Sequence, residues 1–174
     1  MQISFNDLIG YTKWERRKWR QCFEKNGEYL LTISVGPHRD ERFETVGDWV
    51  KHIFSAEIRY VERLSGQPLT DASLVPSHNL NQLFQFGERT RKALEEFVAT
   101  FPAAEWDVPR GFTVLKYQLR MTPRKTITHA LLHEIRHWAQ IATMLRLNGY
   151  RDESHDFLVS PVMGGEIKQQ SAQP

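Results

Sequence analysis

The sequence predicts an all-α protein folded as a four-helix bundle. Four segments of roughly 20 residues or more have apolar residues at helical spacing, three of them after a helix-start signal, and little of the remaining chain has a strand pattern. In the last segment, three histidines lie four residues apart, which places them along one side of a helix. The length of 174 residues fits one domain with a real core, so we expect a single domain over residues 1–174 with a loose tail from about residue 160.

The composition is that of an ordinary globular protein. The chain is 40% hydrophobic and 25% charged, with a formal net charge of +2, which on bulk charge alone gives no basis for nucleic-acid binding. No apolar run approaches the ~20 residues that cross a bilayer. The single cysteine, Cys22, excludes an internal disulfide, and the first residues lack the apolar stretch of a signal peptide. We therefore expect a cytoplasmic protein that binds neither membranes nor nucleic acids.

A capping signature predicts the first helix. Ser4 followed by Asp7 resembles a capping box, so the helix is expected to begin near residue 5 and to end near Asn26. Its middle, residues 13–20, is strongly basic and contains two tryptophans. We interpret this stretch as a solvated face with one packed tryptophan; the alternative is a phosphate-contacting or anion-binding face, through which the helix would bind nucleic acid. The following residues, 28–43, are expected to form either a strand or an apolar connector.

The second helix carries a histidine on its apolar side. Thr45 with Asp48 again gives a capping signature, which predicts a helix over residues 46–65. His52 lies three residues after Trp49 in the apolar stripe, so it shares the buried side of this helix. By itself such a histidine is more typical of a hydrogen-bonded core residue. The presence of further histidines on another amphipathic helix favours metal ligation instead.

The second half of the chain predicts two more helices with a different element between them. Residues 81–101 have helical periodicity, which Gly87 weakens in the middle. Residues 103–121 lack that periodicity and are expected to form an irregular loop or a small β-hairpin. Thr122 as cap and Pro123 in the first helical position predict the start of the last helix, which should run to about residue 148.

This last helix contains His129, His133 and His137. The stretch from His133 to His137 matches the HExxH motif, in which two histidines bind zinc and the glutamate, here Glu134, acts as general base. The extended form of the protease motif is absent because Gln140 stands where a glycine is required. We therefore treat an HExxH zinc protease as the less favoured interpretation and Glu134 as an ordinary polar residue of the helix.

Combining two of these histidines with His52 gives a different site. His52, His133 and His137 supply three imidazoles and leave coordination positions open, as catalytic metal sites do. His129 and His137 diverge by about 80° around a helix of 3.6 residues per turn, so His129 is expected to line the pocket or support a ligand, or to be a helix-surface residue, rather than to bind the ion. Glu57, one turn beyond His52, is a candidate catalytic proton carrier or partner of a ligand; the alternative is a surface ion pair.

These residues resemble a known family. The stretch from His129 to Gly149, followed by Asp156-Phe157, resembles the C-terminal signature of the DinB-like (YfiT-like) metalloenzymes. The stretch from Val50 to Glu57 resembles the histidine-bearing second helix of that family. The chain departs from the pattern at Trp138-Ala139, where Arg-Gly is common, and at Glu134-Ile-Arg136, where smaller residues and tyrosine often occur. The departures leave the ligand assignment intact but weaken any transfer of substrate.

The resemblance implies a four-helix bundle of up-down-down-up order, usually a homodimer. It also implies a divalent metal ion on His52, His133 and His137, with His129 as an extra histidine that is not usually a ligand. Zinc, nickel and iron all suit imidazole ligands. Family members of known chemistry include thiol-dependent S-transferases and a mycothiol-dependent isomerase.

We therefore expect a metal-dependent transferase or hydrolase that acts on a small molecule, with a low-molecular-weight thiol as candidate cosubstrate. The alternative is a non-catalytic dimeric bundle protein of stress response that binds a metal or another ligand.

Overall fold

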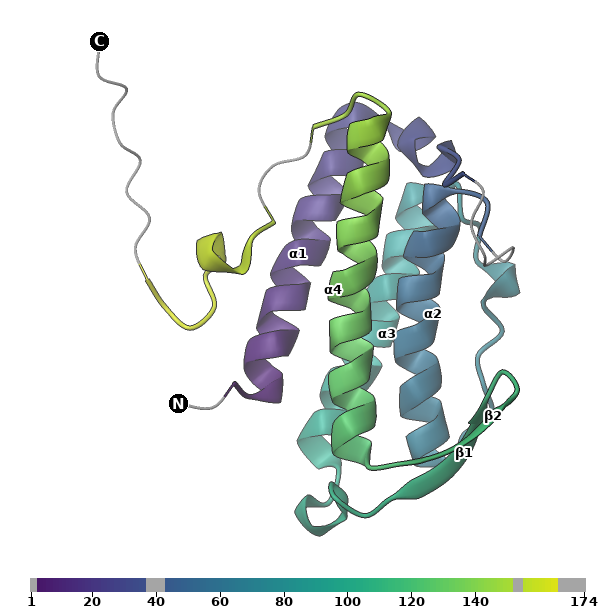
Figure 1. Ribbon diagram of the computed structural model, residues 1–174, viewed down its shortest axis with the longest axis vertical. Coiled ribbons are helices and arrows are strands. Elements are labelled where there is room, and N and C mark those ends of the chain that lie inside the picture. The colour runs from purple at the N-terminus through teal and green to yellow at the C-terminus, as the bar shows by residue number, and fades with distance from the viewer. Residues whose placement is uncertain (1–2, 37–42, 152–154, 166–174) are drawn as a thin grey trace.

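The computed structural model shows four long helices and a small hairpin at one end of the bundle (Figure 1). It describes residues 3–36, 43–151 and 155–165. The predicted fold class is confirmed. The helices are α1 (Phe5–Asn26), α2 (Val46–Ser65), α3 (Leu80–Thr100) and α4 (Pro123–Leu147), and the strands are β1 (Arg110–Val114) and β2 (Tyr117–Met121). Short 3-10 helices are η1 (Glu28–Thr32), η2 (Ala72–Leu74), η3 (Ala103–Glu105) and η4 (Phe157–Val159).

The predicted caps are present at the helix starts. The backbone N–H of Asp7 donates to Ser4 Oγ at 3.2 Å, and the Asp7 carboxylate accepts from the Ser4 backbone N–H at 2.8 Å. Thr45 and Asp48 make the same reciprocal pair, at 3.2 and 3.1 Å. Thr122 caps α4. Because the first N–H groups of a helix have no partner within it, these side chains decide where each helix begins.

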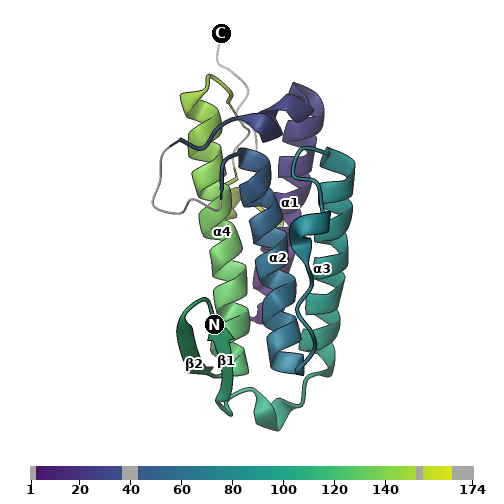
Figure 2. The same cartoon turned by 90° about the vertical axis from the view of Figure 1, so that its right-hand side faces the viewer.

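The helices follow the up-down-down-up order that the family resemblance implied (Figures 1 and 2). α2 and α4 run antiparallel, because His52 lies beside His133, and Tyr60, two turns on, lies beside His129. The connection over residues 66–79 returns along the bundle, so α3 runs parallel to α2 (Figure 2). α2 and α4 therefore form one side of the bundle, while α1 and α3 form the opposite side.

The connector after α1 is not a strand. Residues Glu28–Thr32 form the 3-10 helix η1, in which Leu30 and Leu31 are both fully buried. Adjacent side chains of a strand point to opposite faces, so a strand could not bury both leucines against one core. Beyond η1, an isolated bridge joins Ser34 to Thr45. The rest of this connector, residues 37–42, lies outside the described residues.

The hairpin alternative for residues 103–121 is confirmed. β1 and β2 pair antiparallel in the register Arg110 with Met121, and Leu115 in their turn has a φ of 54°. Two side chains attach the hairpin to the end of α2: Arg63 Nε donates to the Thr113 carbonyl at 3.1 Å, and Arg110 Nη1 donates to the Leu64 carbonyl at 2.6 Å. The hairpin therefore lies across the end of the α2–α4 side, below the histidines.

Gly87 does not interrupt α3, which continues through it. A Cβ atom at this position would lie 2.7 Å from the ring of Phe54, so the absence of a side chain allows α3 to approach α2 closely. Phe54 belongs to the main core together with Trp19, Phe23 and Trp138, all fully buried.

The segment after α4 packs against α1 where it is described. Tyr11 Oη donates to the His155 carbonyl at 2.7 Å, and the Tyr11 and Phe157 rings meet edge to face at 5.1 Å. Most of the predicted loose tail, residues 166–174, lies outside the described residues. Within the described part of the chain, no helix is both long enough and apolar enough to span a membrane.

Candidate metal centre

The fold brings the three predicted ligands together. His52 Nε2 on α2 lies 3.1 Å from His133 Nε2 on α4, and His137 Nε2 lies 3.0 Å from the same atom. One candidate ligand atom from each histidine lies within 4.8 Å of the others. All three side chains are half-buried, so water or a small molecule can reach the cluster.

These distances suit a single ion. Imidazole nitrogens bind zinc at about 2.0–2.1 Å, so neighbouring ligands of one ion lie roughly 3.0–3.4 Å apart. Hydrogen bonding alone does not account for the cluster. His133 Nε2 faces two other ring nitrogens but has either one N–H or one lone pair, so it can satisfy only one of them. A cation at the point where the lone pairs meet would satisfy all three.

The electrostatics keep the central imidazole in its metal-binding form. Burial, followed by the nearby His137 and His52, lowers the pKa of His133 to about 2. The ring is therefore neutral at physiological pH, as metal ligation requires.

Aromatic groups surround the histidine cluster. The Phe43 ring lies 4.6 Å from the His52 ring, and the Trp49 ring lies 6.1 Å from the His137 ring. At the other end of the cluster, His129 lies one turn before His133, with ring centroids 5.6 Å apart. His129 is not one of the grouped ligands, and its ring meets Tyr60 edge to face at 5.3 Å.

His129 also lines a cavity of about 170 Å³ between the hairpin and the α2–α4 side. Phe112, Leu119 and Met121 from the hairpin supply much of its wall, and Tyr60 contributes from α2. Burial raises the pKa of Tyr60 above its ordinary value, so its hydroxyl keeps its proton at neutral pH. The cavity is thus largely apolar, with a hydroxyl and an imidazole in its wall.

Glu57 and Glu134 lie in a separate group, the buried charge cluster, formed by Arg16, Glu57, Arg91 and Glu134. Each of the four helices contributes one of these residues. Arg16 donates to both oxygens of Glu134, at 2.6 and 2.8 Å, and Arg91 donates to Glu134 at 2.6 Å. Glu57 pairs with Arg16 at 3.1 Å and with Arg91 at 2.9 Å. The positive charges of the two arginines and the negative charges of the two glutamates therefore balance inside the bundle.

The interpretation of Glu134 as an ordinary polar helix residue is wrong. Its side chain is buried, and besides the arginines it accepts a hydrogen bond from Trp138 Nε1 at 3.0 Å. Burial alone would raise the pKa of Glu134, but Arg16 and Arg91 outweigh it and hold the pKa below its ordinary value. A carboxylate held by two arginines and an indole is not available as the general base that the HExxH protease interpretation requires.

The contacts of Glu57 favour a structural role. Besides the two arginines, it accepts a hydrogen bond from Thr90 Oγ1 at 2.9 Å. The alternative predicted for Glu57 is a surface ion pair. Glu57 does form ion pairs, but they are buried. The catalytic role of Glu57 stays a prediction.

Sequence reasoning missed Arg16 and Arg91, although a signal was present. Arg16 lies seven residues after the buried Ile9 and seven before the buried Phe23, so it belongs to the inward face of α1. Within residues 13–20 its charge resembled that of its solvated neighbours.

A model of the DinB family matches residues 1–169, which is nearly the whole chain. No curated protein matches the chain.

Proposed function

The chain belongs to the DinB family, and on that premise we propose that it is a divalent-metal-dependent enzyme whose ion binds His52, His133 and His137. The convergence of the three Nε2 atoms from two helices carries the proposal. Three imidazoles leave coordination positions for water or substrate, as in catalytic rather than structural sites. Zinc, nickel and iron are the candidate ions.

We infer a thiol-dependent transferase or a hydrolase as the reaction class. A bound ion would lower the pKa of water or of a low-molecular-weight thiol and so supply a nucleophile at neutral pH. The rings of Phe43 and Trp49 lie beside His52 and His137 on one side of the histidine cluster. On the other side, the cavity beside His129 suits the apolar part of a small electrophile, and the Tyr60 hydroxyl can donate a hydrogen bond to its polar atoms.

A non-catalytic metal-binding bundle is the second candidate, and one observation favours it. Glu57 and Glu134, the two carboxylates considered as proton carriers, are both held by Arg16 and Arg91. Neither is free to act as a general base. In the enzyme, proton transfer would therefore fall to the substrate thiol, to His129 or to solvent.

Two measurements test the proposal. The protein is stripped with a chelator, reloaded separately with zinc and nickel, and analysed by elemental mass spectrometry, where about one ion per chain is expected. The cobalt-substituted protein is then titrated with 2-mercaptoethanol while its visible absorption is followed. A new thiolate band indicates an open coordination position and supports the enzyme. An unchanged spectrum supports the non-catalytic candidate, and failure to retain any ion refutes both. We also propose that the protein is a homodimer, which light scattering would test.

A further inference from the structure

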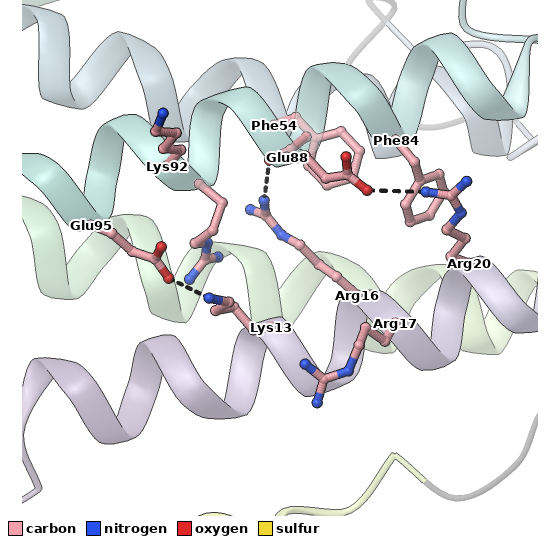
Figure 3. Close-up of a pocket in the computed structure, with 11 residues that line it drawn as sticks. Lys13, Arg16, Arg17, Arg20, Phe54, Phe84, Glu88, Lys92 and Glu95 are labelled. Carbon is pink, nitrogen blue, oxygen red and sulfur yellow. Dashed lines mark hydrogen bonds and ion pairs between the residues drawn. The ribbon is translucent and has the colours of Figure 1, made fainter.

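A groove runs between α1 and α3 (Figure 3). It lies on the side of the bundle opposite the histidine cluster, which is between α2 and α4. Its volume is about 280 Å³. The groove shares no lining residue with the cavity beside the hairpin, and none of the three histidines lines it.

Two ion pairs cross the groove. Lys13 Nζ lies 2.8 Å from Glu95 Oε1, and Arg20 Nη1 lies 3.0 Å from Glu88 Oε1, with each pair joining α1 to α3 (Figure 3). The pairs are seven residues apart on both helices. Each pair crosses the groove from α1 to α3, so the two pairs close its ends and the space between them is short.

The interior combines apolar rings with guanidinium groups. Phe54 and Phe84 meet edge to face at 5.5 Å, and the Arg16 guanidinium lies 4.7 Å from the centre of the Phe54 ring. Arg16 Nη1 reaches across the groove and donates to the Gly87 carbonyl at 2.8 Å (Figure 3). Such a surface suits a ligand with an apolar body and a negatively charged end.

The buried Arg91 has a donor without an acceptor. This residue is only 4% exposed, and its terminal nitrogens donate to Thr12 at 2.7 Å and to Glu134 at 2.6 Å. Its Nε–H is buried and has no hydrogen-bond partner among the described residues. Because a buried N–H without an acceptor is unfavourable, an anion that reaches this wall of the groove with a small side-chain adjustment gains a charge-assisted hydrogen bond.

The lining of the groove itself carries more cations than anions. Arg16 and Arg91 are balanced by the buried glutamates, Lys13 by Glu95, and Arg20 by Glu88 and Glu24. Arg17 makes no hydrogen bond or ion pair with any described residue. Lys92 has only an exposed pair with Glu96 at 3.7 Å. These two cations lie at opposite edges of the groove (Figure 3).

We propose that this groove binds a small organic monoanion, an aromatic carboxylate, with its ring against Phe84 and the Arg16 guanidinium and its carboxylate toward Arg91. The observations favour such a ligand over a nucleic acid. The ion pairs Lys13–Glu95 and Arg20–Glu88 cross the two ends of the groove and close the path that an extended polyanionic backbone would follow.

The test uses 2-naphthoate as the probe and nuclear magnetic resonance of the full chain as the readout. Saturable binding is expected, with the largest shifts at amides of α1 and α3 and a downfield shift of the assigned Arg91 Nε–H. The neutral analogue 2-naphthamide should bind at least about tenfold more weakly, since it lacks the charge that strengthens the hydrogen bond.

A matched pair of double variants tests whether positive charge at the groove, rather than elsewhere on the surface, strengthens the binding of 2-naphthoate. Arg17→Gln with Lys92→Gln should weaken 2-naphthoate binding about three- to tenfold. Lys25→Gln with Arg136→Gln removes the same charge from exposed positions outside the groove and should leave the affinity unchanged. All four positions are exposed, so both variants should fold. Their nuclear magnetic resonance spectra show directly whether they are folded.

Three outcomes overturn the proposal: equal binding of the amide, equal weakening in both double variants, or an unmoved Arg91 Nε–H. Tight, steeply salt-dependent binding of a DNA duplex at the same residues would assign the groove to a polyanion instead.

Discussion

The Nε2 atoms of His52 and His133 lie 3.1 Å apart although the two residues are 81 positions apart in the chain. They meet because α2 and α4 are antiparallel neighbours in the bundle. The site therefore belongs to an interface between two helices, and either helix alone holds an incomplete set of ligands.

Substitution of His52 should weaken metal binding as much as substitution of either histidine on α4. We expect His52→Ala, His133→Ala and His137→Ala each to lower zinc affinity by at least about tenfold, because each removes one of three ligand atoms. His129→Ala should keep most of the affinity, since His129 lies outside the ligand group. Isothermal titration calorimetry with zinc measures the affinity of all four variants. A loss in His129→Ala equal to that of the other three would show that the ligand set is wrong.

Substitution of Glu134 should damage stability rather than metal binding. Glu134→Gln leaves Arg16 and Arg91 sharing the single carboxylate of Glu57, so we expect a loss of about 3–5 kcal/mol in the free energy of unfolding. Urea unfolding followed by circular dichroism gives this value. Zinc binding by the folded fraction should persist.

The same substitution at an exposed ion pair provides the control. Glu96→Gln, which removes the exposed partner of Lys92, should change the unfolding free energy by less than about 1 kcal/mol. If Glu134→Gln proved as stable as this control yet lost a metal-dependent hydrolytic activity, the protease interpretation would regain support.

Glu15 should make stability decline with rising pH. Its carboxyl is buried on α1, and burial followed by the negative charge of Glu134 raises its pKa from 4.5 to about 8. Between these values the folded protein holds a proton that the unfolded chain has released, so the unfolding free energy falls as pH increases and levels off above about pH 8. The slope from this group is at most about 1.4 kcal/mol per pH unit.

The variant Glu15→Gln should flatten this decline, because the amide does not titrate. Unfolding free energies of both proteins at pH 5, 6.5 and 8 would show the curves converging toward low pH and diverging toward high pH. Parallel curves would mean that Glu15 ionises normally in the folded protein.

Gly87→Ala should destabilise the protein, against the usual trend for helices. The new Cβ would lie 2.7 Å from the Phe54 ring, so we expect a loss of about 1–3 kcal/mol from overpacking. Gly10→Ala on α1 is the matched control, because its Cβ would only reach ordinary contact with Val162 at 3.4 Å. The control should gain up to about 1 kcal/mol from helix propensity. Thermal unfolding measures the stability of both variants. A similar gain in stability in both would contradict the close approach of α3 to α2.

The sequence by itself determined where the helices begin and which histidines to examine. Capping pairs such as Ser4 with Asp7 act through hydrogen bonds within a few residues, so they can be recognised without the fold. The His133 and His137 pair likewise follows from helical spacing. The place of His52 on the apolar side of its helix nominated it as the third ligand, and the resemblance to the DinB family implied the same ligand set and the order of the helices.

Only the tertiary structure decided which charged residues are buried. Arg16 and Glu134 look like solvated helix residues in the sequence, but Arg16 Nε lies 2.6 Å from the Glu134 carboxylate, because the inward faces of α1 and α4 meet at this level of the bundle. Burial of a charge is stable only when an opposite charge from another helix arrives at the same place, and that coincidence depends on the relative position of whole helices. The same packing put Glu57 into the buried charge cluster and left the three histidines of α2 and α4 half-exposed.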